Sequence, residues 1–365
     1  TNVLNNSVNK EVYSATTANA NSNLVANYIK KGITIGGITG TLESLNTSDA
    51  TATEEDIAWG KTAYVKGKKI TGTYRTLKDL EIGDYVAYEP DQANNYSLAT
   101  GASGYTTNQT ISQDKLNWRV LRINDNETVD LISDTPTSTN IYFRGAIGYN
   151  NGVYLLNDIA AKLYSNSSFE VTARSLTIED IEEEMTEEGL NYVRTYEASD
   201  GIQFGKTRTY TSNRYYPTLY SRENGSGINT NSTKNDGIEQ SDNYYSAPTT
   251  ETYTQASASL TATQTEYNRT MDISYYKDNF FYNLIHSGNT YWLASRCINL
   301  GRSDVAIFSL RAVNSSKLVG YYLFDSSNYQ SSWGYRLRPL ITLKANLKID
   351  SGDGQSPSTA YQIAQ

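Results

Sequence analysis

Near the start of the chain the sequence reads Ile29-Lys-Lys-Gly32-Ile-Thr-Ile-Gly-Gly-Ile38-Thr39-Gly40-Thr41-Leu42. The same pattern returns as Ile57-Ala-Trp-Gly60-Lys-Thr-Ala-Tyr-Val-Lys-Gly67-Lys-Lys-Ile70-Thr71-Gly72-Thr73-Tyr74. Both segments open with Ile-x-x-Gly and close on Ile-Thr-Gly-Thr followed by an apolar residue. A repeat this short cannot bury a core alone, so we expect it to need neighbouring repeats or other chains.

This pattern resembles the repeats of tail and tail-fibre proteins of phages that infect Gram-positive bacteria. The resemblance covers residues 24–74 and includes Asn27 and Asp56, which precede the two Ile-x-x-Gly motifs. It implies a fibre-like attachment region and a homotrimer. Bacterial surface proteins use similar repeats, and an ordinary pair of β-hairpins is the simplest alternative.

The composition is typical of an extracellular structural protein. The chain has 31 Tyr but one His and one Cys, and its formal net charge is −8. Tyr, Ser, Asn and Gly are abundant in antibody binding sites, although Tyr and Thr also suit β-strands. The negative charge argues against nucleic acid and against an anionic membrane as direct partners.

We divide the chain into a repeat region (1–76), one globular domain (77–348) and a polar C-terminal tail (349–365). Within the domain, apolar and polar residues alternate along Leu116–Ile123 and along Glu127–Ser133, and an Asn-Asp-Asn turn separates the two segments. This pattern predicts a β-hairpin. Two helices are expected, at Val153–Tyr164 and at Thr177–Thr186, the second with Thr177 as its N-cap. Residues 189–269 are expected to form a long, irregular, Tyr-rich excursion.

A second family resemblance lies in the last third of the domain. Its residues are Trp292-Leu-Ala-Ser-Arg296, then Phe308-Ser-Leu-Arg311, then Trp333-Gly-Tyr-Arg-Leu-Arg338-Pro-Leu-Ile341. This order resembles C-type-lectin-like domains of the sulfatase-modifying-factor type, as in phage receptor-binding proteins and Firmicutes surface proteins. It implies an α+β fold: the small β-repeat region, followed by a C-type-lectin-like domain of mixed short strands, two helices and long irregular loops.

The core and the strand ends of this resembled domain can be assigned from the same residues. The residues expected in the core are Trp292, Phe308, Trp333 and Leu337. The arginines expected to form hydrogen bonds near strand ends are Arg296, Arg311, Arg336 and Arg338.

Catalytic and metal-binding residues are scarce, so we expect no enzyme and no cofactor. His286 and Cys297 are interpreted as structural, because no partner for a catalytic dyad can be named. The acidic run from Glu182 to Glu188 is interpreted as a solvated helix face. Asp350–Asp353 and Asn235–Gly237 are possible places for structural calcium, but neither has the spacing of an EF-hand loop.

The resemblance instead favours binding. The phrase from Asp325 to Ser332 lies between two expected strands, where related ligand-binding domains carry variable residues. An exposed hairpin loop without function is the alternative. The residues expected to bind ligand are Tyr322, Asp325, Asn328, Tyr329 and Trp333, followed by Asn314 and Tyr321. Trp333 is also a candidate for the core.

The sequence therefore predicts a receptor-binding or adhesion protein, in a phage tail fibre or phage-like particle. Its expected partners are a bacterial cell-surface glycan or protein and other tail, baseplate or surface-fibre proteins, and its expected location is extracellular. The alternatives are a bacterial surface adhesin or pilus-tip subunit and, from another class, a glycan-acting enzyme with paired carboxylates.

Overall fold

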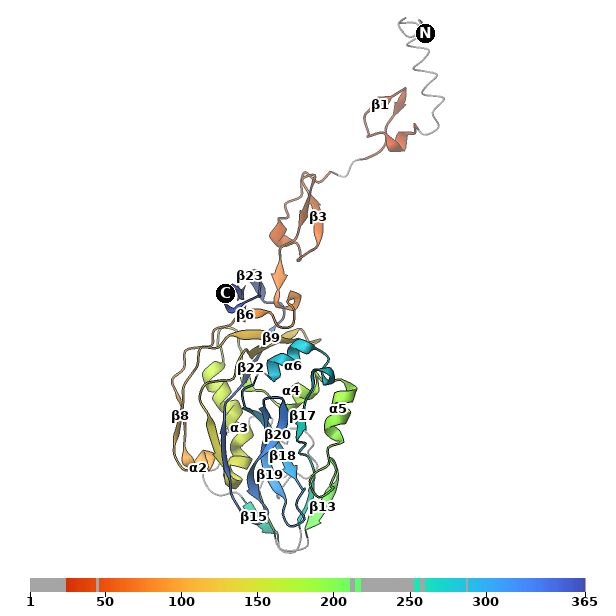
Figure 1. Cartoon of the computed structure of the whole chain (residues 1–365). Coiled ribbons are helices and arrows are strands. Elements are labelled where there is room, and N and C mark those ends of the chain that lie inside the picture. Colours follow the sequence, from red (N-terminus) through yellow and green to blue (C-terminus); the bar gives the residue numbers. More distant parts are fainter. Residues whose placement is uncertain are drawn as a thin grey trace, which may run out of the picture. The chain divides into compact units, whose positions relative to one another are not determined.

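The computed structural model describes residues 24–43, 46–210, 214–217, 253–256, 260–286 and 288–364. The chain divides into two compact units, Thr1–Arg75 and Thr76–Gln365. Figure 1 shows the elements of both units. The sequence analysis placed this boundary after residue 76.

The N-terminal unit contains two modules with the same internal architecture. The elements of the first are η2 (Ala26–Tyr28), β1 (Thr34–Ile35) and β2 (Ile38–Thr39), and those of the second are η3 (Glu54–Asp56), β3 (Thr62–Val65) and β4 (Lys68–Thr71). Each module closes on itself through one parallel bridge, Lys30 with Leu42 and Ala58 with Tyr74. The repeated sequence is thus a repeated fold.

The glycine of each Ile-Thr-Gly-Thr motif is required by a close backbone approach. A Cβ at Gly40 would lie 2.2 Å from the carbonyl oxygen of Ile29, and one at Gly72 would lie 2.2 Å from that of Ile57. The threonine that follows in the second module, Thr73, donates its backbone N–H to Glu54 at 2.7 Å. Any side chain at these glycines would therefore force the two segments of the module apart.

The C-terminal unit is built around two larger sheets. The first has eight strands in the order β12-β22-β10-β9-β6-β24-β23-β5. Their bounds are β12 (Arg174–Ser175), β22 (Pro339–Lys344), β10 (Thr128–Ser133), β9 (Trp118–Ile123), β6 (Tyr85–Ala87), β24 (Tyr361–Ile363), β23 (Lys348–Ser351) and β5 (Arg75–Thr76). The β9–β10 pair is antiparallel, which confirms the predicted hairpin.

The second sheet has four strands in the order β17-β20-β19-β18. Their bounds are β17 (Arg269–Thr270), β20 (Lys317–Asp325), β19 (Ile307–Asn314) and β18 (Tyr291–Asn299). The smaller antiparallel pairs are β11 (Ile141–Arg144) with β21 (Ser332–Tyr335), β7 (Tyr96–Leu98) with β8 (Gln109–Ile111), β13 (Thr207–Tyr210) with β16 (Leu260–Thr263), and β14 (Arg214–Pro217) with β15 (Tyr253–Ala256).

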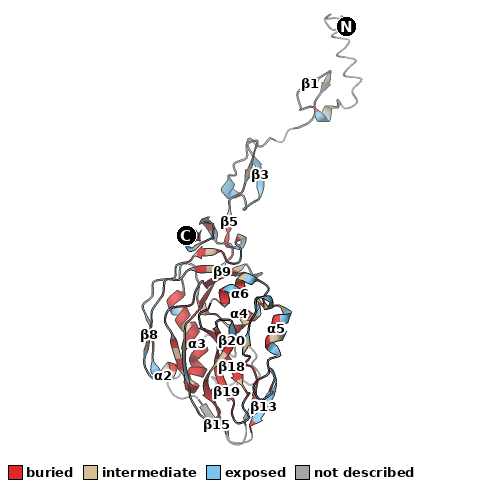
Figure 2. Cartoon of the chain, viewed as in Figure 1, coloured by how far each residue is buried: buried red, intermediate tan, exposed pale blue. Residues whose placement is uncertain are grey.

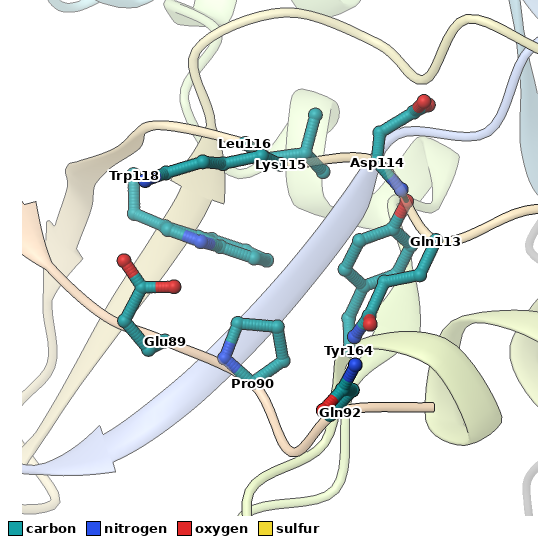
Figure 3. Close-up of a pocket in the computed structure, with 9 residues that line it drawn as sticks. All are labelled: Glu89, Pro90, Gln92, Gln113, Asp114, Lys115, Leu116, Trp118 and Tyr164. Atoms are coloured by element: carbon teal, nitrogen blue, oxygen red, sulfur yellow. Dashed lines mark hydrogen bonds between the residues drawn. The ribbon is translucent and has the colours of Figure 1, made fainter. Parts of the chain in front are cut away.

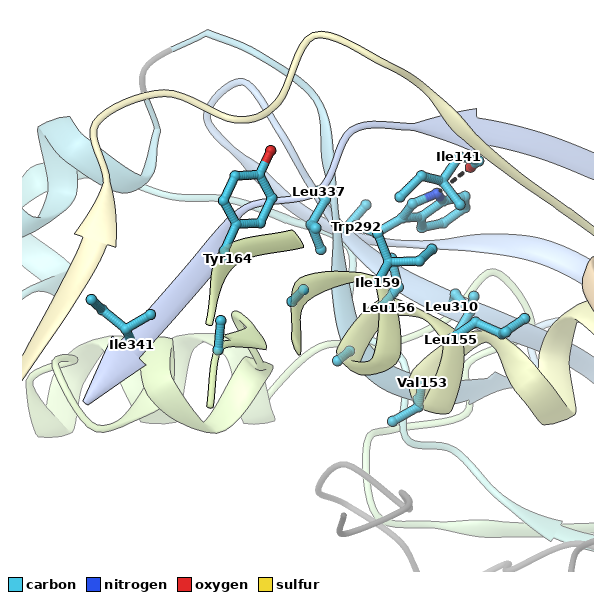
Figure 4. Packing of buried hydrophobic residues seen from close by; sticks show 14 of the residues in the cluster. Ile141, Val153, Leu155, Leu156, Ile159, Tyr164, Trp292, Leu310, Leu337 and Ile341 are labelled. Carbon is cyan, nitrogen blue, oxygen red and sulfur yellow. Dashed lines mark hydrogen bonds between the residues drawn. The ribbon is translucent and has the colours of Figure 1, made fainter. Parts of the chain in front are cut away.

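Helix α3 (Gly145–Tyr164) is the centre of the main core. Most of its residues are buried, as Figure 2 shows by colour. A Cβ at Gly152 would lie 2.3 Å from Leu310, so the helix packs tightly on β19. Figure 4 shows α3 side chains such as Leu155 and Ile159 among Trp292 and Leu337.

The remaining helical elements are short. They are α2 (Thr100–Ser103), α4 (Ile178–Glu182), α5 (Glu187–Arg194) and α6 (Asn279–Ile285), with the 3-10 turns η4 (Leu77–Asp79), η6 (Ile273–Tyr275) and η7 (Pro357–Thr359). Thr177 caps α4, accepting the backbone N–H of Asp180 at 3.3 Å, which confirms the predicted cap. The helix expected to reach Thr186 ends at Glu182, and a new helix begins at Glu187.

The predicted fold class was wrong. The chain is β-rich, with 37% strand and 20% helix, rather than α+β. The described residues form five α-helices instead of two. The expected irregular excursion contains helix α5 and the antiparallel pair of β13 with β16, whose alternating residues form strands. Its residues 211–213, 218–252 and 257–259 lie outside the described residues. In the expected C-terminal tail, Tyr361–Ile363 instead forms β24, which pairs in parallel with β6.

The predicted core aromatics and arginines are mostly in their expected roles. Trp292, Phe308 and Leu337 are fully buried. The guanidinium group of Arg338, also fully buried, donates to the carbonyl oxygens of Ser133, Asp134 and Leu284 at 2.7–3.2 Å. Such buried arginines replace lost hydration with several hydrogen bonds and hold neighbouring segments together.

Candidate functional site

The residues predicted to bind ligand are arranged around β20 and the turn that leads to β21. Tyr321 and Tyr322 are consecutive on β20, opposite Leu310 and Ser309 of β19. Because successive side chains of a strand point to opposite faces, the two tyrosines belong to different surfaces. The predicted set therefore divides into two groups.

The first group is an aromatic cluster, made of Tyr321, Trp333 and Tyr335, which we call the Trp333 cluster. The ring of Tyr321 lies 5.0 Å from that of Trp333 and 4.4 Å from that of Tyr335. Trp333 remains 40% exposed. The buried Trp292 lies beneath, 4.9 Å from Tyr335, and its indole N–H donates to the carbonyl oxygen of Ile141 at 2.8 Å. The exposed tryptophan thus stands on a fixed aromatic base.

The register of β11 with β21 explains why this cluster forms. Trp333 pairs with Phe143, while Gly334 pairs with Tyr142 on the other face of the ribbon. A Cβ at Gly334 would lie 2.3 Å from the Tyr142 ring, so the ring needs the space that this glycine leaves. Tyr105 stacks on Tyr142 at 4.7 Å, which makes this second face aromatic as well.

Neutral side chains form hydrogen bonds at the edge of the Trp333 cluster. The side-chain amide of Asn314 donates to the hydroxyl oxygen of Tyr321 at 2.7 Å, and Thr290 donates to the Asn314 amide oxygen at 3.1 Å. Burial and the hydrogen bond with Tyr321 raise the pKa of Tyr335 far above its ordinary value. Its hydroxyl therefore stays protonated at any physiological pH, and the cluster offers flat apolar faces together with uncharged hydrogen-bonding groups.

The second group surrounds Asp325 at the end of β20. The Tyr322 hydroxyl donates to one carboxylate oxygen of Asp325 at 2.7 Å. The other oxygen accepts the backbone and hydroxyl groups of Ser327 at 2.9 and 2.6 Å and the backbone N–H of Tyr329 at 3.2 Å. Asn328 has a φ of +70°, the left-handed conformation that Asn tolerates in turns. Asp325 is therefore the centre of the turn.

These positions change the interpretation of several predicted residues. Asp325 is only 4% exposed and both of its oxygens are engaged, so the structure places it inside the protein as a positioning residue for the turn. Tyr329 is 61% exposed, and its ring lies 5.8 Å from that of Tyr322. Trp333, which the sequence left between core and surface, is exposed. Tyr329 and Trp333 are thus the two large accessible groups of the predicted set.

Three tyrosines near the cluster were not predicted as site residues: Tyr335, Tyr142 and Tyr105. The alternation of β21 was a usable signal for Tyr335, since residues two apart on a strand share a face. No local signal identifies Tyr142 and Tyr105, because they meet the site only through strand pairing.

The two candidate catalytic residues, His286 and Cys297, have surroundings that are typical of structural residues. Both ring nitrogens of His286 have partners, the Tyr276 hydroxyl at 2.9 Å and the Ser315 carbonyl oxygen at 2.7 Å. Burial, together with the charge of Arg338, lowers the pKa of His286 to about 4 even though the hydrogen bond to Ser315 opposes this. Cys297 is fully buried.

The acidic run is less solvated than predicted. Glu184 lies 3.0 Å from the guanidinium of Arg122, with its side chain only 15% exposed, and Glu183 contacts the same arginine. Glu182 accepts a hydrogen bond from Tyr267 at 3.1 Å. The interpretation as a solvated face was therefore wrong for Glu182 and Glu184, which bind other parts of the unit.

Neither a group of metal-binding side chains nor a membrane-spanning helix is found among the described residues. Within the described ranges, no three His, Cys, Asp or Glu side chains are grouped so that they could hold a metal ion. Asp353 accepts the backbone N–H of Gln355 at 3.0 Å in a turn, and Asn235–Gly237 lies outside the described residues. Among the described helices, none combines the length and the apolar character that crossing a bilayer requires.

Comparison with protein-family models, with curated proteins and with solved structures gave no significant match.

Proposed function

We propose that this protein is a receptor-binding or adhesion protein whose C-terminal unit attaches to a ligand on a bacterial cell surface. The observation that carries the proposal is the Trp333 cluster: a 40% exposed tryptophan supported by partly buried tyrosines and a fully buried Trp292. Side chains held in this way lose little entropy when a ligand binds. Tryptophan and tyrosine are also the residues that most often dominate binding energy.

The chemistry of the cluster suits a neutral ligand. Its hydrogen-bonding groups, including Asn314 and the hydroxyl of Tyr321, are uncharged and already oriented. Flat aromatic faces beside such groups can contact a sugar ring or an aromatic or aliphatic protein side chain. A bacterial surface glycan or protein is the ligand class that the proposal takes from this arrangement.

The N-terminal modules support attachment to other chains. Tyr28, Ile33, Trp59 and Tyr64 are 50–74% exposed, which is unusual for large apolar side chains so close together in the sequence. A homotrimer or another fibre or baseplate protein would cover them. The leading setting is a phage tail fibre or phage-like particle outside the cell, and the alternative is a bacterial surface adhesin.

Binding of purified protein to a panel of Gram-positive cells and isolated cell walls tests the proposal. Trp333→Ala should weaken binding about thirtyfold, as expected for an aromatic anchor worth about 2 kcal/mol. The variant should still melt in one cooperative transition at a somewhat lower temperature, because Trp333 is 40% exposed and the buried Trp292 beneath it is unchanged. Tyr329→Ala is the matched control: Tyr329 lies in the turn after β20, with its ring beside Tyr322 and not in the Trp333 cluster, and the variant should bind as the unmodified protein does.

Two results would contradict the proposal. If Trp333→Ala binds normally while Tyr329→Ala does not, the ligand lies on the face around Tyr322. If neither substitution alters binding to any cell that the unmodified protein binds, the Trp333 cluster has no part in attachment.

A further inference from the structure

A second concave site lies away from the Trp333 cluster, along the strands of the larger sheet. A hollow of about 280 Å³ is lined by Glu89, Pro90, Gln92, Lys115, Leu116 and Trp118, among others (Figure 3). A neighbouring hollow of about 430 Å³ shares Glu89, Lys115, Leu116 and Trp118 and extends to Pro357 and Gln362. The two hollows are adjacent, and we call them together the Trp118 groove. Its size is that of a small-molecule site.

The inner wall of the groove is preformed. Trp118 is 1% exposed and packs edge-on against Tyr88 at 5.1 Å and Tyr164 at 6.2 Å. The Tyr88 hydroxyl donates to the carbonyl oxygen of Tyr164 at 2.7 Å, and the Tyr164 hydroxyl accepts the backbone N–H of Asp114 at 3.1 Å. A ligand would thus meet a wall that needs no rearrangement.

The rim carries polar side chains whose hydrogen-bonding capacity is unused. In the described ranges, no hydrogen bond or ion pair involves the side chain of Glu89, Gln92 or Lys115. The indole N–H of Trp118 is buried and also has no partner among the described residues. A buried N–H without an acceptor is uncommon in folded proteins.

The combination of groups narrows the ligand class. The smaller hollow is lined by two carboxylates, Glu89 and Asp114, and one ammonium, Lys115, so an anion such as phosphate is not favoured. The Asp114 carboxylate already accepts the backbone N–H and the hydroxyl of Ser138, at 2.7 and 2.8 Å. Among the described residues no three His, Cys, Asp or Glu side chains are grouped to hold a metal ion, so a metal cation is not favoured either. A wholly apolar ligand would leave Glu89, Gln92 and Lys115 desolvated without partners. A sugar ring has hydroxyl groups that both donate and accept, together with apolar C–H faces that fit Pro90 and Leu116.

We propose that the Trp118 groove is a carbohydrate-binding site that holds one or two neutral sugar units, separate from the Trp333 cluster. Glu89 and the amide oxygen of Gln92 accept hydrogen bonds from sugar hydroxyls, and Lys115 donates to them. Pro90 and Leu116 contact the apolar faces of the rings, and the buried Trp118 forms the wall behind them. The proposal does not depend on the function assigned to Trp333.

Fluorine NMR with 5-fluorotryptophan in place of the four tryptophans of the full chain provides the test. Trp118→Phe assigns the Trp118 signal; should this variant not fold, the three other Trp→Phe variants assign it by elimination. The probes are glucose, galactose, N-acetylglucosamine and their disaccharides at millimolar concentrations. At least one should shift the Trp118 signal in a saturable way and leave the Trp59 signal in place.

Substitutions at the rim identify the groups involved. Glu89→Ala and Lys115→Ala should each weaken that sugar about tenfold, the effect of losing one hydrogen bond to a charged group. Glu81→Ala and Lys78→Ala remove the same charges from exposed positions outside the groove and should bind normally. Trp333→Ala should also leave the Trp118 shift intact, which separates this proposal from the function assigned to the Trp333 cluster.

Three outcomes would overturn the proposal. One is that no sugar of the panel shifts the Trp118 signal. Another is that Glu89→Ala and Lys115→Ala bind the sugar as tightly as their controls do. The third is that short peptides shift the signal while sugars do not, in which case the groove holds a protein segment.

Discussion

In the two N-terminal modules most large apolar side chains are exposed, whereas in the C-terminal unit Trp118 and Trp292 are almost completely buried. Trp59 of the second module is 52% exposed, and Ile29, at 5%, is the one buried apolar side chain among the described module residues. The modules are held by backbone hydrogen bonds and by the close approach at Gly40 and Gly72. The C-terminal unit is held by side-chain packing around α3. We therefore call the two N-terminal modules the backbone-defined region and the C-terminal unit the core-defined region.

The largest expected effect is on the core-defined region. Trp292→Ala should lower the free energy of unfolding of the C-terminal unit by about 3–5 kcal/mol, because it opens a cavity and removes a buried hydrogen bond. Trp59→Ala, in the backbone-defined region, should change stability by less than about 0.5 kcal/mol. Chemical denaturation of both variants measures the difference. Similar losses in the two variants would break the comparison.

The next effect concerns the backbone-defined region. Gly72→Ala should destabilise the second module by about 2–3 kcal/mol, because its Cβ would collide with the carbonyl oxygen of Ile57. Gly67→Ala is the matched control: it has a φ of +77° but open space around it, so it should cost only about 1 kcal/mol. Hydrogen exchange at the Thr73 amide reports on the module. Equal exchange rates in the two variants would show that the close approach does not hold the module together.

The sequence predicted features whose residues lie close together in the chain better than features that join distant residues. The repeat, the Thr177 cap and the β9–β10 hairpin were predicted correctly because their signals lie within a few residues of one another. The parallel pairing of β24 with β6 joins opposite ends of the unit, and no local pattern indicates it. For the same reason, the fold class was wrong: short strands separated by polar segments resembled irregular loops.

The candidate site shows the same limit. Trp333, which the sequence singled out for its neighbourhood of Tyr, Ser and Asn, is exposed. Asp325 was also expected at the surface, but its carboxylate lies inside the turn. A short polar phrase does not reveal which of its members satisfies the backbone of the others. The Trp118 groove was not predicted at all, because its walls come from residues 85–92, 113–118 and 357–362 and from Tyr164.

A smaller expected effect is a dependence of stability on pH that distinguishes the C-terminal unit from the N-terminal modules. The pKa of His286 is lowered to about 4, against about 6.5 in an unfolded chain, because burial disfavours its charged form. As the pH falls from about 6.5 to about 4, the unfolded chain takes up a proton that the folded unit does not, so the C-terminal unit loses stability over this range.

Chemical denaturation of the unmodified protein and of His286→Gln, across this pH range, measures the effect. The variant should have a lower stability at neutral pH but a flatter dependence on pH, since the titrating group is gone. An equally steep decline in both proteins would show that buried carboxylates, and not His286, set the pH dependence.

The smallest expected effect is also the most direct test of the comparison. Because the modules depend on their own backbone contacts and the C-terminal unit on its own core, deleting residues 24–74 should leave the cooperative melting transition of the C-terminal unit within about 0.5 kcal/mol of its original stability. Deleting residues 349–364 is the matched control, and it should abolish the transition because β24 lies between β6 and β23 inside the sheet. If removing the modules unfolds the C-terminal unit as well, the chain does not consist of two regions stabilised in different ways.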